Sequence, residues 1–233
     1  MKVRSKNIII LAIIALMLNA DFIFSQNIQE MFMYQIDGNK YEKTSYDKKD
    51  NIISTQIIEA GTVQKKGSKY ILPVKIFSYD KDGKLEDTYE TNYSCEPSEG
   101  KLFMHVFPLS NKENYTNVSI RLLSENNFYP VDMGVKNLLP DISFSMDIEG
   151  GVLGFFGANS KINISDRKIS NEEIESKNYY IKEKMEINAY MFGFKIKTIN
   201  YSVKETFNFL TGIIQQEYRK NSGEYFVITL IKS

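Results

Sequence analysis

Residues 142–148 read ISFSMDI, an uninterrupted alternation of apolar and polar side chains. Successive side chains of a β-strand point to opposite faces of a sheet, so this stretch places its apolar side chains on one face and its polar ones on the other. A strand that is buried on one face and solvated on the other is typical of antiparallel sheets. The stretch therefore predicts an antiparallel sheet with one apolar face.

The last third of the chain follows the same pattern. Its alternating apolar positions are Tyr179, Ile181, Met185, Ile187, Ile199, Tyr201, Val203, Phe207, Tyr225, Val227 and Ile231. Turn-forming sequences rich in glycine, asparagine and aspartate separate the apolar runs, at residues 47–51, 66–67, 80–83 and 221–223. We expect an all-β fold, a single antiparallel meander curled into a barrel or half-barrel, lipocalin-like or LolA-like in general architecture, because curling protects the edges of a sheet.

The N-terminus has the parts of an export signal: basic residues at positions 2, 4 and 6, an apolar run over residues 8–18, and Ser25 at the exit. The apolar run is shorter than the roughly 20 residues that a membrane-spanning helix needs. We expect residues 1–25 to be a cleaved signal peptide and residues 26–233 to form a single all-β domain without a transmembrane span. The alternative is an uncleaved anchor lengthened by residues 22–24. The predicted location is the periplasm or the outer envelope.

The charges of the chain are balanced, with 29 basic and 29 acidic residues. Loss of residues 1–25 would leave a formal charge of −2. This balance gives no electrostatic reason for a nucleic-acid or anionic-membrane partner, and we expect no nucleic acid. Cys95 is the single cysteine, so no internal disulfide can form. Because no basic residue stands near it in the sequence, we expect a buried apolar side chain and not a reactive thiol.

The sequence offers no catalytic set. His105 is the single histidine, so neither a histidine-based metal site nor a serine hydrolase has the residues it requires. Residues 80–83 read DKDG but lack the later ligands of an EF-hand, and they predict a β-turn. Glu183 and Glu205, on neighbouring predicted strands, would serve a glycosidase only if both carboxyls faced one cleft. We expect no enzymatic activity, no cofactor and no metal.

Tyrosine-rich strand and turn sequences mark both halves of the chain. They are YEKTSYDKK at residues 41–49, FSYDKDGK at 77–84, YSC at 93–95, YSVKETF at 201–207, TGIIQQEY at 211–218 and LIK at 230–232. The set resembles the TapB-like family of exported proteins, a group of unknown function common in Bacteroidota. The resemblance spans residues 40–108 and 128–233. It implies an exported, all-antiparallel β fold with a barrel-like or half-barrel cavity, and it carries no catalytic residue.

Residues 150–158, GGVLGFFGA, depart from the polar turn expected between two strands. Their glycines give conformational freedom, and their apolar side chains give a surface that a solvated turn does not normally show. We interpret this segment either as a flexible hydrophobic lip or as a connection folded back over the core.

Two functions fit these patterns. The first is a periplasmic carrier that holds an apolar small molecule or lipid between the apolar face of the sheet and the lip. The candidate lining is Phe144, Met146, Leu153, Phe155, Phe156, Met191, Phe192 and Phe194. The alternative is a structural or interaction module, filled by its own side chains, whose surface meets another envelope protein. An interior space of several hundred cubic ångströms would favour the carrier, and close-packed side chains would favour the module.

Overall fold

The computed structural model describes residues 36–96, 116–124, 129, 137–149, 157–170, 178–208 and 210–231. These residues form a sheet of 12 strands. The strands are β1 (Lys40–Tyr46), β2 (Ile52–Ala60), β3 (Gln64–Lys66), β4 (Lys69–Asp80), β5 (Leu85–Cys95), β6 (Thr116–Leu122), β7 (Ile142–Glu149), β8 (Asn159–Ser170), β9 (Asn178–Met191), β10 (Phe194–Asn208), β11 (Gly212–Lys220) and β12 (Tyr225–Ile231). Within the described residues, no helix is long and apolar enough to cross a membrane.

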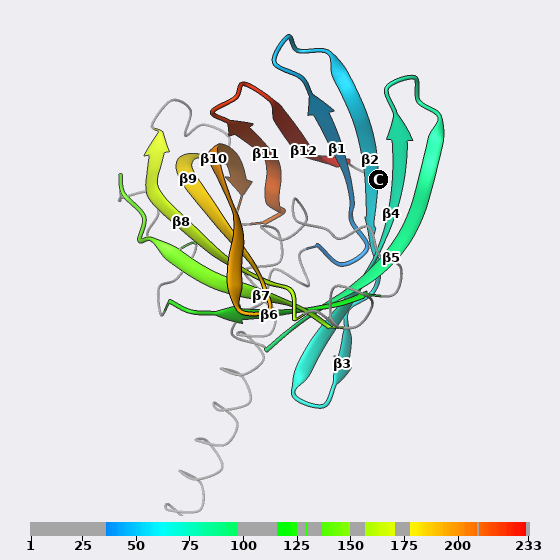
Figure 1. Ribbon diagram of the computed structural model, residues 1–233, viewed down its shortest axis with the longest axis vertical. Helices are drawn as coiled ribbons and strands as arrows, with labels where there is room; N and C mark the ends of the chain where they lie inside the picture. The colour runs from blue at the N-terminus through cyan, green and yellow to red at the C-terminus, as the bar shows by residue number, and fades with distance from the viewer. Residues whose placement is uncertain are drawn as a thin grey trace, which may run out of the picture.

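The sheet closes into a barrel. Neighbouring strands follow the order β2-β1-β12-β11-β10-β9-β8-β7-β6-β5-β4, and a further pairing of β2 with β4 joins the two ends. The predicted all-β barrel is therefore confirmed as a closed barrel of 11 strands. Closure satisfies the backbone groups that an open sheet would leave at its edges. Strand β3 lies outside the ring and pairs with the first residues of β4. The hairpin that these two segments form projects below the barrel in Figure 1.

One pair of neighbouring strands is parallel. Residues Thr91 to Ser94 of β5 pair with Thr116 to Ser119 of β6 in the same direction, whereas the other pairings between the strands are antiparallel. A parallel pair requires a long connection between its strands, and β5 and β6 are separated in the sequence by residues 96–115. The fold therefore departs from the purely antiparallel meander that the sequence predicts at this single place among the described strands.

The two ends of the barrel carry different connections. The β1–β2, β4–β5, β9–β10 and β11–β12 turns lie at one end, called here the turn end, because Tyr46 pairs with Tyr225 and Tyr201 pairs with Lys220. The opposite end carries the β10–β11 turn and the C-terminal residue of β12. Backbone hydrogen bonds close the turns predicted at residues 47–51, 80–83 and 221–223, and the turn at 66–67 joins β3 to β4.

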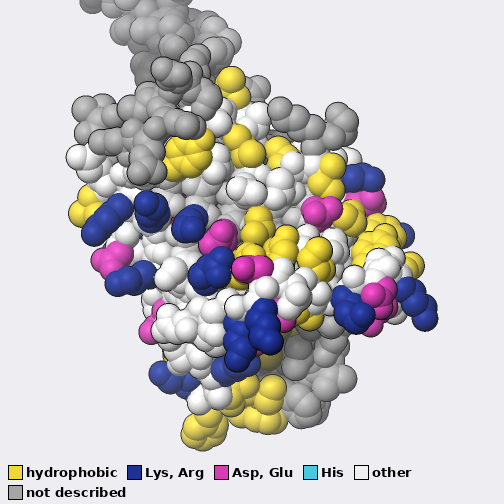
Figure 2. Space-filling view, turned by 90° about the horizontal axis from the view of Figure 1, so that it is seen from above, with side chains coloured by type: hydrophobic (Ala, Val, Ile, Leu, Met, Phe, Trp, Pro, Cys, Tyr) yellow, Lys and Arg dark blue, Asp and Glu magenta, His cyan; other side chains and the backbone are white. Residues whose placement is uncertain are grey.

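Alternate side chains of each strand fill the described interior. The largest fully buried ones are Arg167, Tyr41, Tyr70, Tyr89, Tyr93, Tyr218, Phe144 and Phe207. Cys95 is buried among them, as predicted. On the face shown in Figure 2, basic and acidic side chains are mixed with several groups of hydrophobic side chains. This mixture agrees with the equal numbers of basic and acidic residues in the chain. The described part of the barrel is thus packed with its own side chains.

Candidate functional site

A β-bulge on β8 turns an arginine into the barrel. Ser165 pairs with Lys184 and Lys168 pairs with Lys182, so Asp166 and Arg167 together stand opposite Glu183. Asp166 adopts the left-handed conformation, with φ of 53°, which aspartate tolerates better than most residues. Beyond this point the buried positions of β8 change phase, and Arg167 becomes fully buried. The bulge therefore puts a cation where regular alternation would have kept it outside.

The buried arginine is the centre of an ionic cluster, defined here as Tyr129, Arg167, Glu183, Glu205 and Gln216. Arg167 Nε donates to Glu183 Oε2 over 3.0 Å, and Arg167 Nη1 donates to the carbonyl of Pro140 over 3.2 Å. Glu205 accepts from the Tyr129 hydroxyl over 2.6 Å and from Gln216 Nε2 over 2.7 Å. The Tyr129 ring lies beneath the guanidinium of Arg167, 5.5 Å from its carbon, and stacks on Phe207. Five separate segments of the chain meet in this cluster inside the barrel.

The two carboxyl groups of the ionic cluster share one guanidinium. Burial raises the pKa of Glu205 to about 8, and the nearby Glu183 charge adds to the increase, while Tyr129, Arg167 and Gln216 oppose it. Burial also raises the pKa of Glu183, against the charge and hydrogen bond of Arg167. Because Glu183 is in direct contact with Arg167, we assign the negative charge to Glu183 and the proton to Glu205 at neutral pH.

The positions of Glu183 and Glu205 do not match the open cleft of a glycosidase. Glu183 and Glu205 do lie on neighbouring strands and on the inner face, but they are only 4% and 2% exposed. A glycosidase places its two carboxyls on an open cleft that receives the sugar. Here the carboxyls contact side chains of the barrel itself, and no group of three or more metal-binding side chains occurs among the described residues. The ionic cluster therefore fits a structural role.

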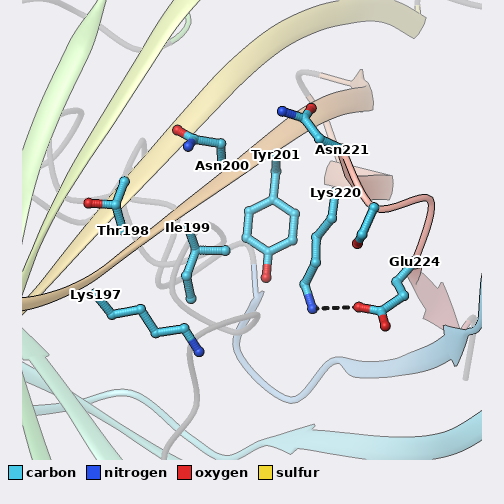
Figure 3. A pocket seen from close by; sticks show the side chains of 9 residues that line it. Lys197, Thr198, Ile199, Asn200, Tyr201, Lys220, Asn221 and Glu224 are labelled. Carbon is cyan, nitrogen blue, oxygen red and sulfur yellow. Dashed lines mark hydrogen bonds and ion pairs between the residues drawn. The ribbon is translucent and has the colours of Figure 1, made fainter.

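A pocket of about 400 Å³ opens at the turn end of the barrel. This mouth pocket lies between the first residues of β10 and the β11–β12 turn, and it is lined by Lys197, Thr198, Ile199, Asn200, Tyr201, Lys220, Asn221, Ser222 and Glu224. Figure 3 shows the side chains of Ile199, Tyr201 and Lys220 on the same side of the sheet, with Thr198 and Asn200 turned away. Lys220 pairs with Glu224 over 3.0 Å.

The floor of the mouth pocket is aromatic. Tyr201 meets the rings of Tyr218 and Phe226 edge to face, at 5.9 and 5.7 Å, and those two rings stack on each other at 4.7 Å. Burial raises the pKa of Tyr201, and Lys220 opposes the increase. Lys197, in contrast, has no ion-pair partner among the described residues. The pocket thus combines an aromatic floor with one uncompensated cation.

Two further hollows lie elsewhere on the barrel. One, of about 490 Å³, crosses β9, β10 and β11 and is bridged by the ion pair of Lys204 with Glu217 at 3.3 Å. The other, of about 300 Å³, lies over β2, β4 and β5 beside Gly61 and Pro73. Both linings are rich in polar side chains, among them Lys204 and Glu217 in the first and Glu59, Lys75 and Glu90 in the second. The mouth pocket is the better candidate because Tyr201 in its lining joins an aromatic group with Tyr218 and Phe226.

The structure distributes the predicted lining residues over different places. Phe144 and Met146 are buried on the inner face of β7, at 0% and 4% exposure. Met191 is half-buried at the end of β9, whereas Phe192 and Phe194 are exposed at the β9–β10 turn. Leu153, Phe155 and Phe156, like most of the segment 150–158, lie outside the described residues. The described members therefore do not form one pocket.

Lys197, Ile199, Tyr201 and Lys220 of the mouth pocket were not among the predicted site residues. A signal for the ionic cluster did exist, because Glu183 and Glu205 occupy the apolar phase of two otherwise regular strands. No such signal existed for Arg167, because its side chain points inward only as a result of the bulge between Ser165 and Lys168. The mouth pocket could not be read from local pattern, because its lining comes from β10 and from a turn about 20 residues further along the chain.

The fold and the mouth pocket define a β-barrel protein with a small amphipathic site at one rim. The chain belongs to the DUF3108-like family, whose model matches residues 36–230. The predicted TapB-like relationship is supported only at this level, and the TapB-like name itself stays a prediction.

Two solved structures resemble the chain. One is a candidate exported protein with a YmcC-like fold from Bacteroides fragilis NCTC 9343, with 14% identity, a TM-score of 0.45, and coverage of 83% of this chain and 94% of that chain. The other is a candidate lipoprotein from Parabacteroides distasonis ATCC 8503, with 15% identity, a TM-score of 0.45, and coverage of 84% and 94%. No curated protein matches the chain.

Proposed function

We propose that this chain is an exported binding protein whose mouth pocket takes an acidic amphiphile, a small molecule with one anionic group and an apolar body. The observation that carries the proposal is the meeting of Lys197 and Lys220 with Ile199 and Tyr201 in a hollow of about 400 Å³. A volume in this range suits small organic ligands, and an apolar lining with a few placed charges is typical of their sites. The ligand would rest at the mouth, because the aromatic floor lies directly below.

The charges of the pocket favour an anion. Glu224 offsets Lys220 through their ion pair, and Lys197 is left to attract a negatively charged group. The apolar body would lie against Ile199 and the Tyr201 ring, both of which pack on the core. Burial of that body supplies affinity, and the ammonium group supplies orientation.

Fluorescence titration tests this function with the anionic aromatic dye 1-anilinonaphthalene-8-sulfonate, displaced by dodecanoate. Lys197→Glu reverses the charge inside the pocket, and we expect it to weaken binding of both probes by about tenfold or more. The matched control is Lys195→Glu, two residues away and paired with Tyr190 outside the pocket lining, which should leave binding unchanged. Equal effects of the two variants, or no effect of Lys197→Glu, would reject the proposal.

The interaction module is the second candidate, and the filled interior of the described barrel favours it. Native and denaturing masses of the chain purified gently from the periplasm of a Gram-negative host separate the two functions. A bound species of a few hundred daltons, lost on denaturation, supports the ligand-binding function. A bare protein mass after addition of lipid extract favours the interaction module, whose partner crosslinking would then identify.

A further inference from the structure

The β9–β10 turn differs from the other described turns at its end of the barrel. Residues 47–51, 80–84 and 220–224 read DKKDN, DKDGK and KNSGE, all polar or charged apart from their glycines. The hairpin tip, defined here as residues 191–196, reads MFGFKI. Its side chains at Phe192, Phe194 and Ile196 are 65%, 76% and 59% exposed. A group of exposed large apolar side chains marks an interaction site, whereas single exposed apolar side chains are normal on a protein surface.

The backbone conformation at the hairpin tip is unfavourable for Phe192. Phe192 has φ of 53° and Gly193 has φ of 79°, so both central residues of this two-residue turn are left-handed. Such turns prefer Asn-Gly, because asparagine tolerates this conformation and a bulky aromatic residue does not. The conformation of the turn therefore does not favour a phenylalanine at position 192.

The hairpin tip also reaches beyond β11. Strand β10 pairs with β11 only from Tyr201 onward, although β10 begins at Phe194. On the other side, the pairing of β9 with β8 ends at Tyr190. A register shift between Lys195 and Lys197 inserts Ile196 as an extra residue and adds an apolar side chain to the tip. On the side of β10 that pairs with β11, the hairpin tip thus extends past the last residue of β11.

The charge around the hairpin tip has one sign. Residues 189–201 contain Lys195 and Lys197 and no acidic residue, within a chain that is neutral overall. Aromatic rings beside lysine side chains match the interface of an anionic bilayer, where the rings enter the headgroup region and the ammonium groups meet lipid phosphates. Neither a second copy of this tip nor a basic partner would offer this complementarity, because like charges repel.

We propose that the hairpin tip inserts into the surface of an anionic lipid bilayer and holds the turn end of the barrel against it. The contact does not depend on occupancy of the mouth pocket, because Phe192 and Phe194 lie outside the pocket lining. It would place the mouth of the barrel next to the membrane.

The absence of tryptophan from the chain provides a direct test. Phe194→Trp and Leu210→Trp introduce a single reporter at the hairpin tip and at the opposite end; Leu210 is 83% exposed and serves as the matched control. The chain from Gln26 onward contains the whole described barrel and is mixed with phosphatidylcholine vesicles containing one quarter phosphatidylglycerol. We expect the emission of Phe194→Trp to shift to the blue and to be quenched by brominated lipid, with no change for Leu210→Trp. No shift, or equal shifts, would overturn the proposal.

Cosedimentation with the same vesicles gives the second measurement. The double variant Phe192→Asn with Phe194→Ser should lose at least about tenfold in partitioning, while Leu210→Ser should not. Pure phosphatidylcholine vesicles should bind the unmodified chain more weakly. The double variant should still bind 1-anilinonaphthalene-8-sulfonate at the mouth pocket. Dye binding therefore tests the mouth pocket, and vesicle binding tests the hairpin tip, independently of each other. Unchanged partitioning, or sedimentation velocity showing dimers that the double variant abolishes, would contradict membrane insertion.

Discussion

The ionic cluster and the hairpin tip reverse the usual placement of side chains. Inside the barrel, Arg167 and Glu183 are charged and fully buried, whereas at the tip Phe192 and Phe194 are apolar and mostly exposed. Buried charges and exposed apolar groups are both costly, so each needs a compensating cause. The cluster has its compensation within the fold, through hydrogen bonds among side chains from five segments. At the tip, Phe192 and Phe194 stay 65% and 76% exposed, and we propose that a membrane surface covers them.

The two regions also differ in how many elements determine them. The ionic cluster depends on a bulge in β8, on β9, β10 and β11, and on Tyr129 from the connection between β6 and β7. The hairpin tip is formed by the ends of β9 and β10, which are neighbours in the sequence. Changes in the cluster should therefore alter the stability of the whole barrel, and changes at the tip should alter binding far more than folding. Three substitutions test this contrast.

Glu183→Gln should have the largest effect. It leaves the buried Arg167 without its carboxylate partner, and breaking a buried pair in this way costs about 3–5 kcal/mol. Urea unfolding at neutral pH measures the loss. The matched control is Asp166→Asn on the same bulge, which breaks the exposed ion pair with Lys184 and should leave the free energy of unfolding unchanged within error. A small effect of Glu183→Gln would mean that Arg167 is compensated elsewhere.

Glu205 should make stability depend on pH. Its pKa is about 8 in the folded barrel and near 4.5 when unfolded, so the folded chain keeps a proton that the unfolded chain releases. This contribution to stability is fully present below pH 4.5 and is lost as pH rises towards 8. The slope is at most about 1.4 kcal/mol per pH unit.

Thermal unfolding between pH 5 and pH 8 measures this dependence. The melting temperature of the unmodified chain should fall as pH rises, and Glu205→Gln should reduce the slope because glutamine resembles the protonated carboxyl. Comparison of the two proteins cancels the contributions of the titratable groups that both retain. Parallel curves would show that Glu205 is ionised in the folded barrel throughout this range.

Phe192→Asn should have the smallest effect on stability, and in the opposite direction. Asparagine is preferred at a left-handed position in this turn, so the free energy of unfolding should rise by about 1 kcal/mol. Urea unfolding measures the change. The control is Gly193→Ala, which should have the opposite effect and destabilise the barrel. A φ of 79° strains any residue that has a Cβ atom, and no neighbouring atom lies close enough to this position to add a clash. A loss of stability in Phe192→Asn would place the ring in the packing and not in a binding surface.

Much of the barrel wall could be predicted from the sequence. The alternation ISFSMDI became β7, with Phe144 and Met146 buried, and glycine- and aspartate-rich sequences became turns at the predicted positions. The site was harder to predict. Phe192 and Phe194 carry the same apolar character as Phe144, and nothing in their local sequence shows that β11 ends before it reaches them.

The sequence by itself determined the strands, the turns and the apolar face, because side-chain alternation and turn preferences act over a few residues. Only the tertiary structure decided closure through the pairing of β2 with β4, the inward turn of Arg167 at the bulge, and the meeting of Tyr129 with Glu205. These features depend on register between segments that are distant in the chain. A shift of one residue in that register exchanges the inner and outer faces of a strand, and local alternation does not encode which register is adopted.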